Sequence, residues 1–465
     1  MVVKGMTFNM DIEKVNTLNN GKELKYYIHT FGCQMNVHDS EKLAGMLLRM
    51  GYQWTAHEED ADLILYNTCC VREHAELKVY GNIGALKELK RLKPHLMIGI
   101  CGCMMQQKEV SDFIQKRFPY VDVIFGTHNL HLFPTFLYDA IVSGQNVVKI
   151  QEDEGNIIEG LPIERAEGVS TWVTIMYGCE NYCTYCIVPY VRGRERSRHS
   201  DVILKEIEGL VKSGYKEITL LGQNVNSYGI DLHDVQVNFS YLLREINKIK
   251  NLYRIRFMTS HPKDLSDDLI IAISECQKVC NQLHLPIQSG SNTILEKMNR
   301  RYTREFYIDL IHRIRTYNPN ISISTDIIVG FPGESEDDFT DTLDLLKTIQ
   351  FDSAYTFIYS KRNGTPAATM QNQIEYQVKK ERLLQINALQ GAISLTINQQ
   401  YMNQTFDVLV ERVSKKHASV LTGRTESGKI VNMQGDIALI GKLVKVKITK
   451  SKSWSLEGVI KEENL

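Results

Sequence analysis

The sequence predicts an α/β protein with three folded domains, and three observations carry that prediction. Two series of strand and helix patterns alternate along the chain, which is typical of parallel α/β domains. Short alternating runs divided by glycines follow them and indicate a small all-β barrel. The 465 residues, of which 43% are hydrophobic and 23% charged, are enough to bury several cores.

Residues 1–23 are polar, and we expect them to be disordered or extended. They contain no apolar segment of the kind that directs secretion. The most apolar short window, residues 96–105, is about half as long as a membrane span. We therefore expect a cytoplasmic protein without membrane contact. In that compartment the ten cysteines point to metal or redox chemistry rather than to disulfides.

The first alternating series spans residues 24–144 and predicts a small parallel α/β domain. The expected strands are 25–31, 62–67, 95–100 and 120–125, and the expected helices are 39–50, 72–91 and 131–142. Cysteines come just past three of these strands: Cys33, then Cys69 and Cys70, then Cys101 and Cys103. Open α/β sheets bind ligands at the carboxyl ends of their strands. We therefore expect a metal cluster there, the alternative being that these cysteines are small core residues.

The second alternating series spans residues 169–397, after an acidic stretch at 145–168 that we expect to be a linker. Its expected strands are 172–177, 217–221, 254–258, 283–287, 322–329 and 354–359. Six strand–helix units predict a partial (β/α)6 barrel, curved but not closed, with its function on the loops at the carboxyl ends of the strands. Polar, glycine-rich turns at 222–224, 288–291 and 330–334 lie at such ends, and we expect them to line a cofactor pocket.

The C-terminal residues 398–465 predict the small all-β barrel. They carry eleven Lys and Arg against seven Asp and Glu, in a chain whose net charge is −1. Small barrels often bind nucleic acid, and the slight basic excess fits a polyanion partner. A plain stabilising module fits the same pattern equally well.

The loop after the first barrel strand carries three cysteines, Cys179, Cys183 and Cys186, with gaps of three and two residues. Three thiolates this close together can bind three corners of a cubane iron–sulfur cluster and leave one iron open. A structural zinc site is the alternative, but zinc normally takes four ligands. The next histidine, His199, is thirteen residues farther on, so the spacing favours the iron–sulfur cluster.

This loop on a six-unit barrel resembles that of the radical S-adenosylmethionine (SAM) superfamily, and the surrounding motifs resemble the methylthiotransferases, in particular their MiaB branch. The motifs that carry the resemblance in the N-terminal domain are Phe31–Asn36, Asn67–Glu73 and Gly102–Cys103. Those of the barrel are Tyr177–Tyr190, Arg192–Arg198, Leu285–Ser291, Asn299–Thr303 and Thr325–Glu334. The C-terminal barrel is similar to a TRAM domain. The resemblance covers nearly the whole chain from Leu24 onward.

The resemblance implies two [4Fe-4S] clusters and S-adenosyl-L-methionine as cofactors. By motif match Cys179, Cys183 and Cys186 hold the radical cluster, and Cys33, Cys69 and Cys103 hold an auxiliary cluster. Cys70 and Cys101 depart from the single-cysteine pattern of the family, so either could replace a ligand. Gln223, Ser289, Asp326 and Gly330 are the candidates for holding S-adenosylmethionine. Cys276 and Cys280 match no motif, and their spacing fits one packed helix face.

The implied reaction adds a methylthio group to carbon 2 of an isopentenylated adenosine, N(6)-dimethylallyladenosine, at tRNA position 37. S-adenosylmethionine bound at the open iron of the first cluster would be cleaved after a one-electron reduction and yield the radical that attacks the base. The auxiliary cluster would supply the sulfur, so we expect the two clusters to face each other across the adenine. An electron donor and a sulfur source are also implied, and we expect a monomer.

The expected tRNA contacts are two basic runs near the barrel rim and the C-terminal barrel. The runs are Arg192, Arg194, Arg196 and Arg198, then Arg300, Arg301 and Arg304, and the barrel contributes Arg424, Lys445 and Lys447. Two alternatives stay open: a methylthiotransferase for threonylcarbamoyl-adenosine in tRNA, and a non-catalytic iron–sulfur RNA-binding protein. The Val71–Glu73 sequence and the Tyr177–Gly178 lead-in favour the isopentenyl-adenosine branch. The strand-end turns argue against the mere binding protein, which needs no cofactor rim.

Overall fold

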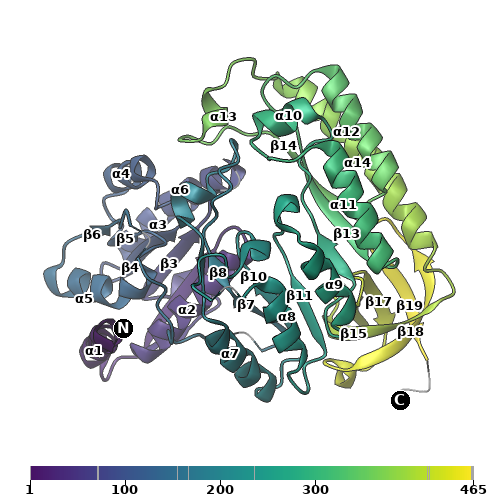
Figure 1. The fold of residues 1–465 in the computed structure, drawn as a ribbon. Coiled ribbons are helices and arrows are strands. Elements are labelled where there is room, and N and C mark those ends of the chain that lie inside the picture. The colour runs from purple at the N-terminus through teal and green to yellow at the C-terminus, as the bar shows by residue number, and fades with distance from the viewer. Residues whose placement is uncertain are drawn as a thin grey trace. The chain divides into compact units, whose positions relative to one another are not determined.

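The computed structural model describes residues 2–70, 73–153, 155–165, 167–234, 236–415, 417 and 419–461 (Figure 1). Val71 and Arg72, part of the Asn67–Glu73 motif, lie outside the described residues. The chain forms two compact units. The first comprises residues 1–166, 177–180 and 187–194, and the second comprises 167–176, 181–186 and 195–465. None of the helices in the described ranges is long and apolar enough to span a membrane.

The first unit is built on a six-stranded parallel sheet with the order β2-β1-β3-β4-β5-β6. Its strands are β1 (Leu24–Thr30), β2 (Tyr52–Trp54), β3 (Leu63–Thr68), β4 (Met97–Gly102), β5 (Val123–Phe125) and β6 (Val147–Lys149). Its helices are α1 (Val2–Asn19), α2 (Gln34–Arg49), α3 (Glu73–Leu92), α4 (Lys108–Arg117), α5 (Phe133–Ser143) and α6 (Val188–Arg192). Every residue of β3 is buried, as expected for a parallel strand covered on both faces. The predicted parallel α/β domain is confirmed.

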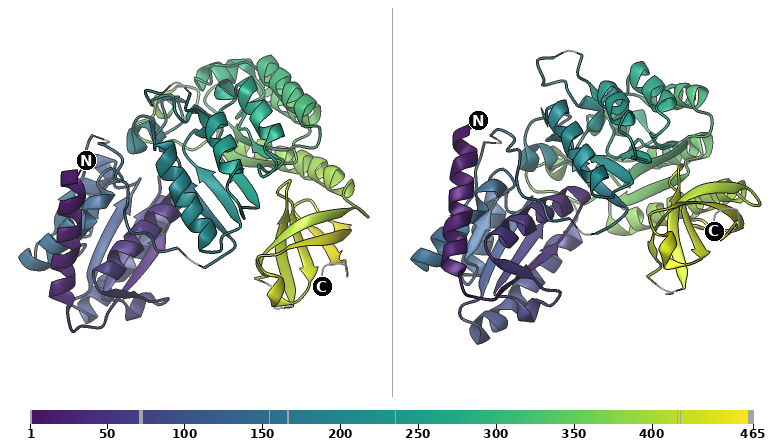
Figure 2. Two further views of the ribbon diagram at one scale, coloured as in Figure 1. Left: turned by 60° about the horizontal axis from the view of Figure 1, so that its bottom comes forward. Right: turned by 90° about the horizontal axis from the view of Figure 1, so that it is seen from below.

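Residues 1–23 were predicted to be disordered or extended, and this prediction is wrong, because residues 2–19 form helix α1. Ile12 and Val15 lie one helical turn apart and are buried in the core beneath the sheet. Asp11 accepts a hydrogen bond from Thr135 Oγ1 of α5 at 2.6 Å, and α1 packs along α5 (Figure 2). Among residues 9–19, whose side chains the structure describes, two buried apolar side chains identify the inner face. Two such residues are too weak a periodic signal to detect within a polar segment.

The boundary predicted at residue 144 also lies too early. Residues 147–149 form β6, which extends the sheet beside β5. Part of the expected linker is packed as well, since the Glu164 amide donates to the Glu41 carbonyl of α2 at 2.9 Å. The prediction missed β6 because a three-residue edge strand carries almost no alternation.

The second unit begins with six parallel strands in two three-stranded sheets, ordered β11-β10-β7 and β12-β13-β14. The strands are β7 (Ser170–Thr174), β10 (Glu217–Leu221), β11 (Arg254–Phe257), β12 (Gln282–His284), β13 (Ser322–Val329) and β14 (Ser353–Ile358). A parallel bridge between Ile255 and Val279 links the two sheets. The strands therefore follow one another in a curved, open series, and the prediction of a partial barrel is confirmed.

Eight helices of the described second unit accompany these strands, and α12 and α14 run side by side (Figure 1). They are α7 (Ser200–Lys212), α8 (Phe239–Asn247), α9 (Asp267–Glu275), α10 (Asn292–Lys297), α11 (Arg304–Tyr317), α12 (Glu336–Ile349), α13 (Pro366–Thr369) and α14 (Tyr376–Gln399). Local sequence defines several starts; for example, Ser335 and Asp338 form a reciprocal capping box at α12. Two short strands, β8 (Met176–Tyr177) and β9 (Arg196–Ser197), precede and follow the cysteine loop.

The C-terminal residues close into a five-stranded barrel with the order β15-β16-β17-β19-β18 (Figure 2). The strands are β15 (Thr405–Val413), β16 (Val420–Thr425), β17 (Ile430–Gln434), β18 (Leu443–Ser451) and β19 (Leu456–Ile460). Alternate residues of β18, Val444, Val446 and Ile448, point into the barrel core. The predicted small all-β barrel is confirmed.

Two buried arginines join this barrel to the amino ends of the parallel strands. Arg254 donates to the carbonyls of Arg424 at 2.7 Å and Asp407 at 2.9 Å. Arg256 donates to the carbonyl of Thr425 at 2.9 Å and pairs with Glu217 at 2.9 Å. The bonds to the C-terminal barrel all end on backbone oxygens. The two arginines therefore hold its main chain and do not depend on which side chains it carries.

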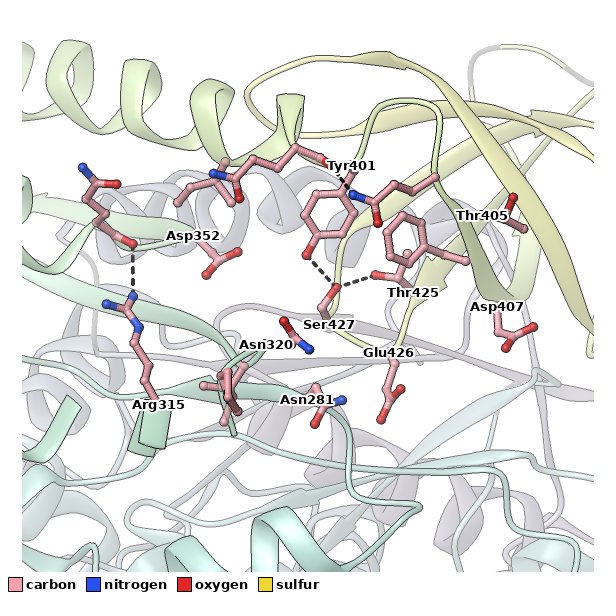
Figure 3. Close-up of a pocket in the computed structure, with 17 residues that line it drawn as sticks. Asn281, Arg315, Asn320, Asp352, Tyr401, Thr405, Asp407, Thr425, Glu426 and Ser427 are labelled. Carbon is pink, nitrogen blue, oxygen red and sulfur yellow. Dashed lines mark hydrogen bonds between the residues drawn. The ribbon is translucent and has the colours of Figure 1, made fainter. Parts of the chain in front are cut away.

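A polar cavity of about 640 Å³ lies at the same ends of the strands. Figure 3 shows Tyr401, Ser427 and Thr425 joined by hydrogen bonds on its barrel side. Asn281 and Asp352 line the opposite side, immediately before strands β12 and β14. This cavity lies at the amino ends of the parallel strands. Enzymes with (β/α) barrels carry their catalytic residues at the opposite, carboxyl ends of these strands. We therefore do not assign the cavity to the catalytic site.

Candidate metal and cofactor sites

The cysteines of the first unit lie at the carboxyl ends of three adjacent strands. Cys33 follows β1, Cys69 and Cys70 follow β3, and Cys103 follows β4, and these strands are neighbours in the sheet. The Asn36 Oδ1 atom lies 3.8 Å from the sulfur of Cys33 and 3.7 Å from that of Cys103. The register of the sheet thus brings thiols that are 70 residues apart in the chain to one polar atom.

Glycines before two of these cysteines let the strand ends approach each other. Gly32 has φ +109°, and a Cβ atom there would stand 2.6 Å from the sulfur of Cys69. Gly102 has φ +98°, and its Cβ would stand 2.4 Å from the Thr68 carbonyl oxygen. Any side chain at either position would clash and would strain the backbone. The Gly–Cys pairs of the sequence motifs therefore reflect close packing at the thiol site.

Cys70 and Cys101, the two competing thiols, occupy different surroundings. Cys70 packs with Cys103, Ile187 and Val191, and its hydrogen bond to Cys103 is the main reason that the pKa of Cys103 falls to about 6. Cys101 instead belongs to the hydrophobic core under the sheet, where burial raises its pKa well above the ordinary value. Cys101 is thereby a core residue, whereas Cys69 and Cys70 both lie at the thiol site.

Arg192, at the end of α6, is buried among these thiols. Its Nε donates to the sulfur of Cys103 at 3.2 Å, and its Nη2 donates to Asn36 Oδ1 at 3.0 Å. Its Nη1 forms an ion pair with Asp39 at 2.7 Å. Burial by itself would lower the pKa of Arg192, but Asp39 and the thiols of Cys103 and Cys33 raise it well above its ordinary value. The arginine is charged beside the sulfur.

The expected phosphate-binding role of the two arginine runs is wrong for their buried members. Arg192, Arg198 and Arg300 are each at most 7% exposed. Arg198 pairs with Glu206 at 2.8 Å, and Arg304 is partly buried in an ion pair with Asp344. Carboxylates and carbonyls within the protein accept hydrogen bonds from these guanidinium groups. Such partners cannot be predicted from the sequence. Arg194 and Arg301 are exposed.

The three cysteines of the central loop fall in both units, and local bonds shape each part. In the first unit the Cys179 amide donates to the Gly193 carbonyl at 3.1 Å. In the second unit the Cys186 amide donates to the Cys183 carbonyl at 2.9 Å, which makes a tight turn. The Thr184 amide and hydroxyl donate to the Met298 and Lys297 carbonyls. Chain connectivity alone keeps Cys179 within about 14 Å of Cys183.

Strained backbone marks this part of the second unit. Tyr182, between the cysteines, has φ +46°, and Thr259, Gln288, Asn299 and Arg301 also have positive φ. Non-glycine residues rarely adopt this region, and such strain concentrates at functional sites. Asn299 donates to the carbonyls of Asn181 and Tyr182, so the strained turn at 299–301 supports the cysteine loop.

The thiols at the strand ends fit the ligand chemistry of an iron–sulfur cluster. In a [4Fe-4S] cluster each cysteine binds a different iron, so the sulfurs are spread around the cluster. Thiols at three strand ends, a thiol pKa of about 6 at Cys103 and a buried cation beside it fit a group held by thiolates.

The residues predicted to hold S-adenosylmethionine have mixed surroundings. Ser289 is fully buried and hydrogen-bonds Thr342, and Lys379 covers the Cα of Gly330. Both positions are packed within the fold, and their proposed role in holding S-adenosylmethionine stays a prediction. Gln223, after β10, and Asp326, on β13, are half-buried, so both can still face a ligand.

A polar group lies on the loops after β10 and β11, and the sequence analysis predicted only its Asn224, within the turn 222–224. Asn224 Oδ1, Asn226 Oδ1, Ser260 Oγ and His261 Nε2 are buried, and each lacks a hydrogen-bond partner in the described structure. The two loops are bonded to each other, since the Val225 amide donates to the Thr259 carbonyl at 3.0 Å. Buried polar atoms without partners are costly, so this cluster fits a polar cofactor such as S-adenosylmethionine. The signal was the polar run 259–261, directly past a buried strand.

His261 presents a defined donor within that cluster. Its Nδ1 accepts a hydrogen bond from the Lys263 amide at 3.3 Å, so the proton of the neutral ring lies on Nε2. Burial lowers the pKa of His261 strongly, and Arg300 lowers it further. The ring is therefore neutral near pH 7 and offers an N–H group to a ligand.

The prediction that Cys276 and Cys280 share a helix face is wrong. Helix α9 ends at Glu275, and both cysteines follow it. Both are buried, and burial raises the pKa of Cys280 to about 11. Such protonated, enclosed thiols are structural.

Comparisons with known proteins agree with the three domains. Residues 25–126 match the Uncharacterized protein family UPF0004, residues 173–346 match the Radical SAM superfamily, and residues 399–461 match the TRAM domain. Among solved structures, the radical S-adenosylmethionine methyltransferase TsrM from Kitasatospora setae, with cobalamin and a [4Fe-4S] cluster bound, is similar with a TM-score of 0.56. It is 13% identical in sequence, and the match covers 74% of each chain. That likeness concerns the fold alone.

Curated relatives are similar over nearly their whole lengths. The tRNA-2-methylthio-N(6)-dimethylallyladenosine synthase of Acetivibrio thermocellus is 57% identical over 455 residues, which cover 97% of this chain and 95% of the relative. The proteins of that name in Clostridium perfringens and Thermoanaerobacter pseudethanolicus are 56% and 54% identical, over 96% of this chain and 100% and 94% of theirs. The resemblance seen in the motifs is confirmed, and the chain belongs to the MiaB-type methylthiotransferases, a family of radical SAM enzymes.

Proposed function

We propose that this enzyme converts N(6)-dimethylallyladenosine at tRNA position 37 to its 2-methylthio derivative. The observation that carries the proposal is the 54–57% identity to synthases of that name over nearly the full chain. Two [4Fe-4S] clusters and S-adenosylmethionine, when bound, supply the radical and the sulfur chemistry that the inert ring carbon requires.

The chain's own contribution is to hold these groups and to exclude water. Cys179, Cys183 and Cys186 are the proposed ligands of the radical cluster. Cys33, Cys69 and Cys103 are the proposed ligands of the auxiliary cluster, which the strand-end geometry supports. Three protein ligands leave one iron of each cluster open.

S-adenosylmethionine would lie against the unpaired polar atoms beyond β10 and β11. The amide oxygens of Asn224 and Asn226 accept hydrogen bonds, and His261 Nε2 donates one. Gln223 and Asp326 keep their proposed role beside them, because both are half-buried. The amides and the imidazole among these groups are neutral and would orient the cofactor through hydrogen bonds.

The tRNA contact proposed for the C-terminal barrel is supported by the outer face of β18. Lys445 and Lys447 point outward between the inward-facing valines, and both are exposed. Lys445 is paired with Asp407 at 3.1 Å, so Lys447 is the better phosphate ligand. Lys447→Glu should weaken tRNA binding and flatten its salt dependence. If the salt dependence of tRNA binding stays unchanged in this variant, the outer face of β18 does not contact tRNA.

The function is tested by anaerobic incubation of the cluster-loaded enzyme with reductant, S-adenosylmethionine and dimethylallylated tRNA, followed by nucleoside analysis. A methylthio product is expected with this tRNA and not with threonylcarbamoylated tRNA. Product from the second tRNA alone would assign the enzyme to the other branch, and no product from either would overturn the function. An electron donor and a sulfur source are needed as partners, and a reducing cytoplasm suits both clusters.

The ligand sets are tested by single substitutions in the same assay. Cys179→Ala should abolish formation of deoxyadenosine. Cys69→Ala should preserve it and lose sulfur insertion, whereas Cys70→Ala should keep both activities. If Cys70→Ala loses sulfur insertion and Cys69→Ala keeps it, Cys70 and not Cys69 is the ligand of the auxiliary cluster.

A further inference from the structure

We propose that Arg192 and Asp39 form a buried pair that sets the reduction potential of the auxiliary cluster, with Arg192 raising it and Asp39 lowering it. The inference rests on the proposed function, because it takes Cys103 to be a cluster ligand. It assigns the pair a tuning role, in place of the phosphate contact expected for Arg192.

The contacts of Arg192 support this role. Each guanidinium nitrogen donates a hydrogen bond at the thiol site: Nε to the Cys103 sulfur at 3.2 Å, Nη1 to Asp39 at 2.7 Å and Nη2 to Asn36 Oδ1 at 3.0 Å. Asn36 Oδ1 also lies 3.8 Å from the Cys33 sulfur and 3.7 Å from the Cys103 sulfur. The guanidinium group therefore connects the Asp39 carboxylate to the Cys103 sulfur.

Burial makes the two charges effective. The side chains of Arg192 and Asp39 are each 7% exposed, so little solvent screens them. A buried guanidinium beside a cluster favours the added electron, and a hydrogen bond to a ligand sulfur acts in the same direction. The Asp39 carboxylate opposes both effects. Substitution of either residue should therefore shift the potential, with opposite signs.

The position of Arg192 in the sequence also supports its role in tuning the auxiliary cluster. Arg192 follows Cys186, a proposed radical-cluster ligand, by only six residues, yet it packs against α2 and β4 of the first unit. Its neighbour Arg194, two residues on, is exposed. Surface solvation or phosphate contact would require Arg192 to point outward as Arg194 does.

The test uses the full chain with Cys179, Cys183 and Cys186 all replaced by Ala, so that only the auxiliary cluster assembles. Iron and sulfide are counted, and the potential is measured by dithionite titration with mediators, followed by electron paramagnetic resonance. In this background Arg192→Gln should shift the potential to a more negative value, and Asp39→Asn should shift it to a more positive one. Arg194→Gln, the matched control from the same run, should leave it unchanged.

The outcomes separate this proposal from the proposed ligands. If the triple-Ala protein binds no iron, the auxiliary ligand set fails. If it binds a cluster whose potential stays unchanged in both variants, or moves in one direction in both, the tuning role is overturned while the ligand set stands. Should Arg192→Gln fail to bind iron, Asp39→Asn decides the matter: a more positive potential supports the tuning role, and an unchanged or more negative potential overturns it.

Discussion

Arg300 donates a hydrogen bond from Nη1 to the sulfur of Cys183 across 3.4 Å. Arg300 is only 4% exposed, and it also donates to the Pro286 carbonyl at 2.8 Å and to the hydroxyls of Tyr302 at 2.7 Å and Tyr185 at 3.4 Å. It thus links a proposed ligand of the radical cluster to the barrel.

Arg300→Gln should lower the iron affinity of the radical cluster, because the bond that orients Cys183 is lost. Residues that orient metal ligands typically account for about 10–100-fold in affinity or activity. We expect that loss in deoxyadenosine formation and in iron content, measured with Cys33, Cys69 and Cys103 replaced by Ala. Arg301→Gln, on the exposed neighbour, is the control; an equal loss there would mean that Arg300 has no special role.

His261→Phe should weaken S-adenosylmethionine binding about tenfold, since one buried hydrogen bond contributes about 1.4 kcal/mol. The substitution keeps an aromatic ring and removes the Nε2 donor, together with the Nδ1 atom that accepts the hydrogen bond of the Lys263 amide. Equilibrium dialysis with the anaerobically loaded enzyme measures the dissociation constant. The exposed His312 of α11 provides the control His312→Phe, and identical affinities in both variants would exclude His261 from the pocket.

The thiol of Cys103 should titrate near pH 6 in the cluster-free protein, because Cys70 and Arg192 stabilise its thiolate. The thiolate form therefore dominates above pH 6 and is lost as the pH falls through that value. Thiolate absorbance in the ultraviolet, taken as the difference from Cys103→Ala, follows this step. Cys70→Ala removes the largest cause and should move the step to higher pH; a step that stays in place would show that Cys70 does not control it.

Gly102→Ala should destabilise the first unit by about 3 kcal/mol, since it combines a strained φ with a clash against the Thr68 carbonyl. It should also prevent assembly of the auxiliary cluster. Gly84, in the exposed interior of α3, has no atom within 4 Å of a built Cβ. Gly84→Ala should therefore stabilise the protein by about 1 kcal/mol. Urea unfolding compares the two, and equal effects would contradict the packing argument.

Arg254→Ala should destabilise the second unit by about 3 kcal/mol, because it leaves the carbonyls of Arg424 and Asp407 without their donor. Arg244 forms a half-exposed pair with Asp268, and Arg244→Ala should cost about 0.5 kcal/mol. Thermal unfolding of both variants measures the difference. A small effect for Arg254→Ala would mean that the barrel is held by other contacts.

Most of the architecture followed from local patterns. Strands β10 and β13 lie at the predicted residues, because buried parallel strands are continuous apolar runs bounded by turns. The elements that sequence analysis missed, α1, α4, β2 and β6, are mainly short or carry few buried residues among those that the structure describes. Their position depends on partners far away in the chain, which no local window contains.

The sequence by itself determined the three domains, the family and the two cysteine groups, since glycine–cysteine pairs and close cysteine spacing are local properties of the chain. Only the tertiary structure decided which arginines are buried and which of the neighbouring thiols lie at the proposed cluster site. Arg192 and Arg194 look alike in the sequence, yet one is buried against Asp39 and the other is exposed. Cys101 and Cys103 differ in the same way, as core residue and site residue. Burial and charge pairing arise from contacts between distant segments, so they appear only once the chain is folded.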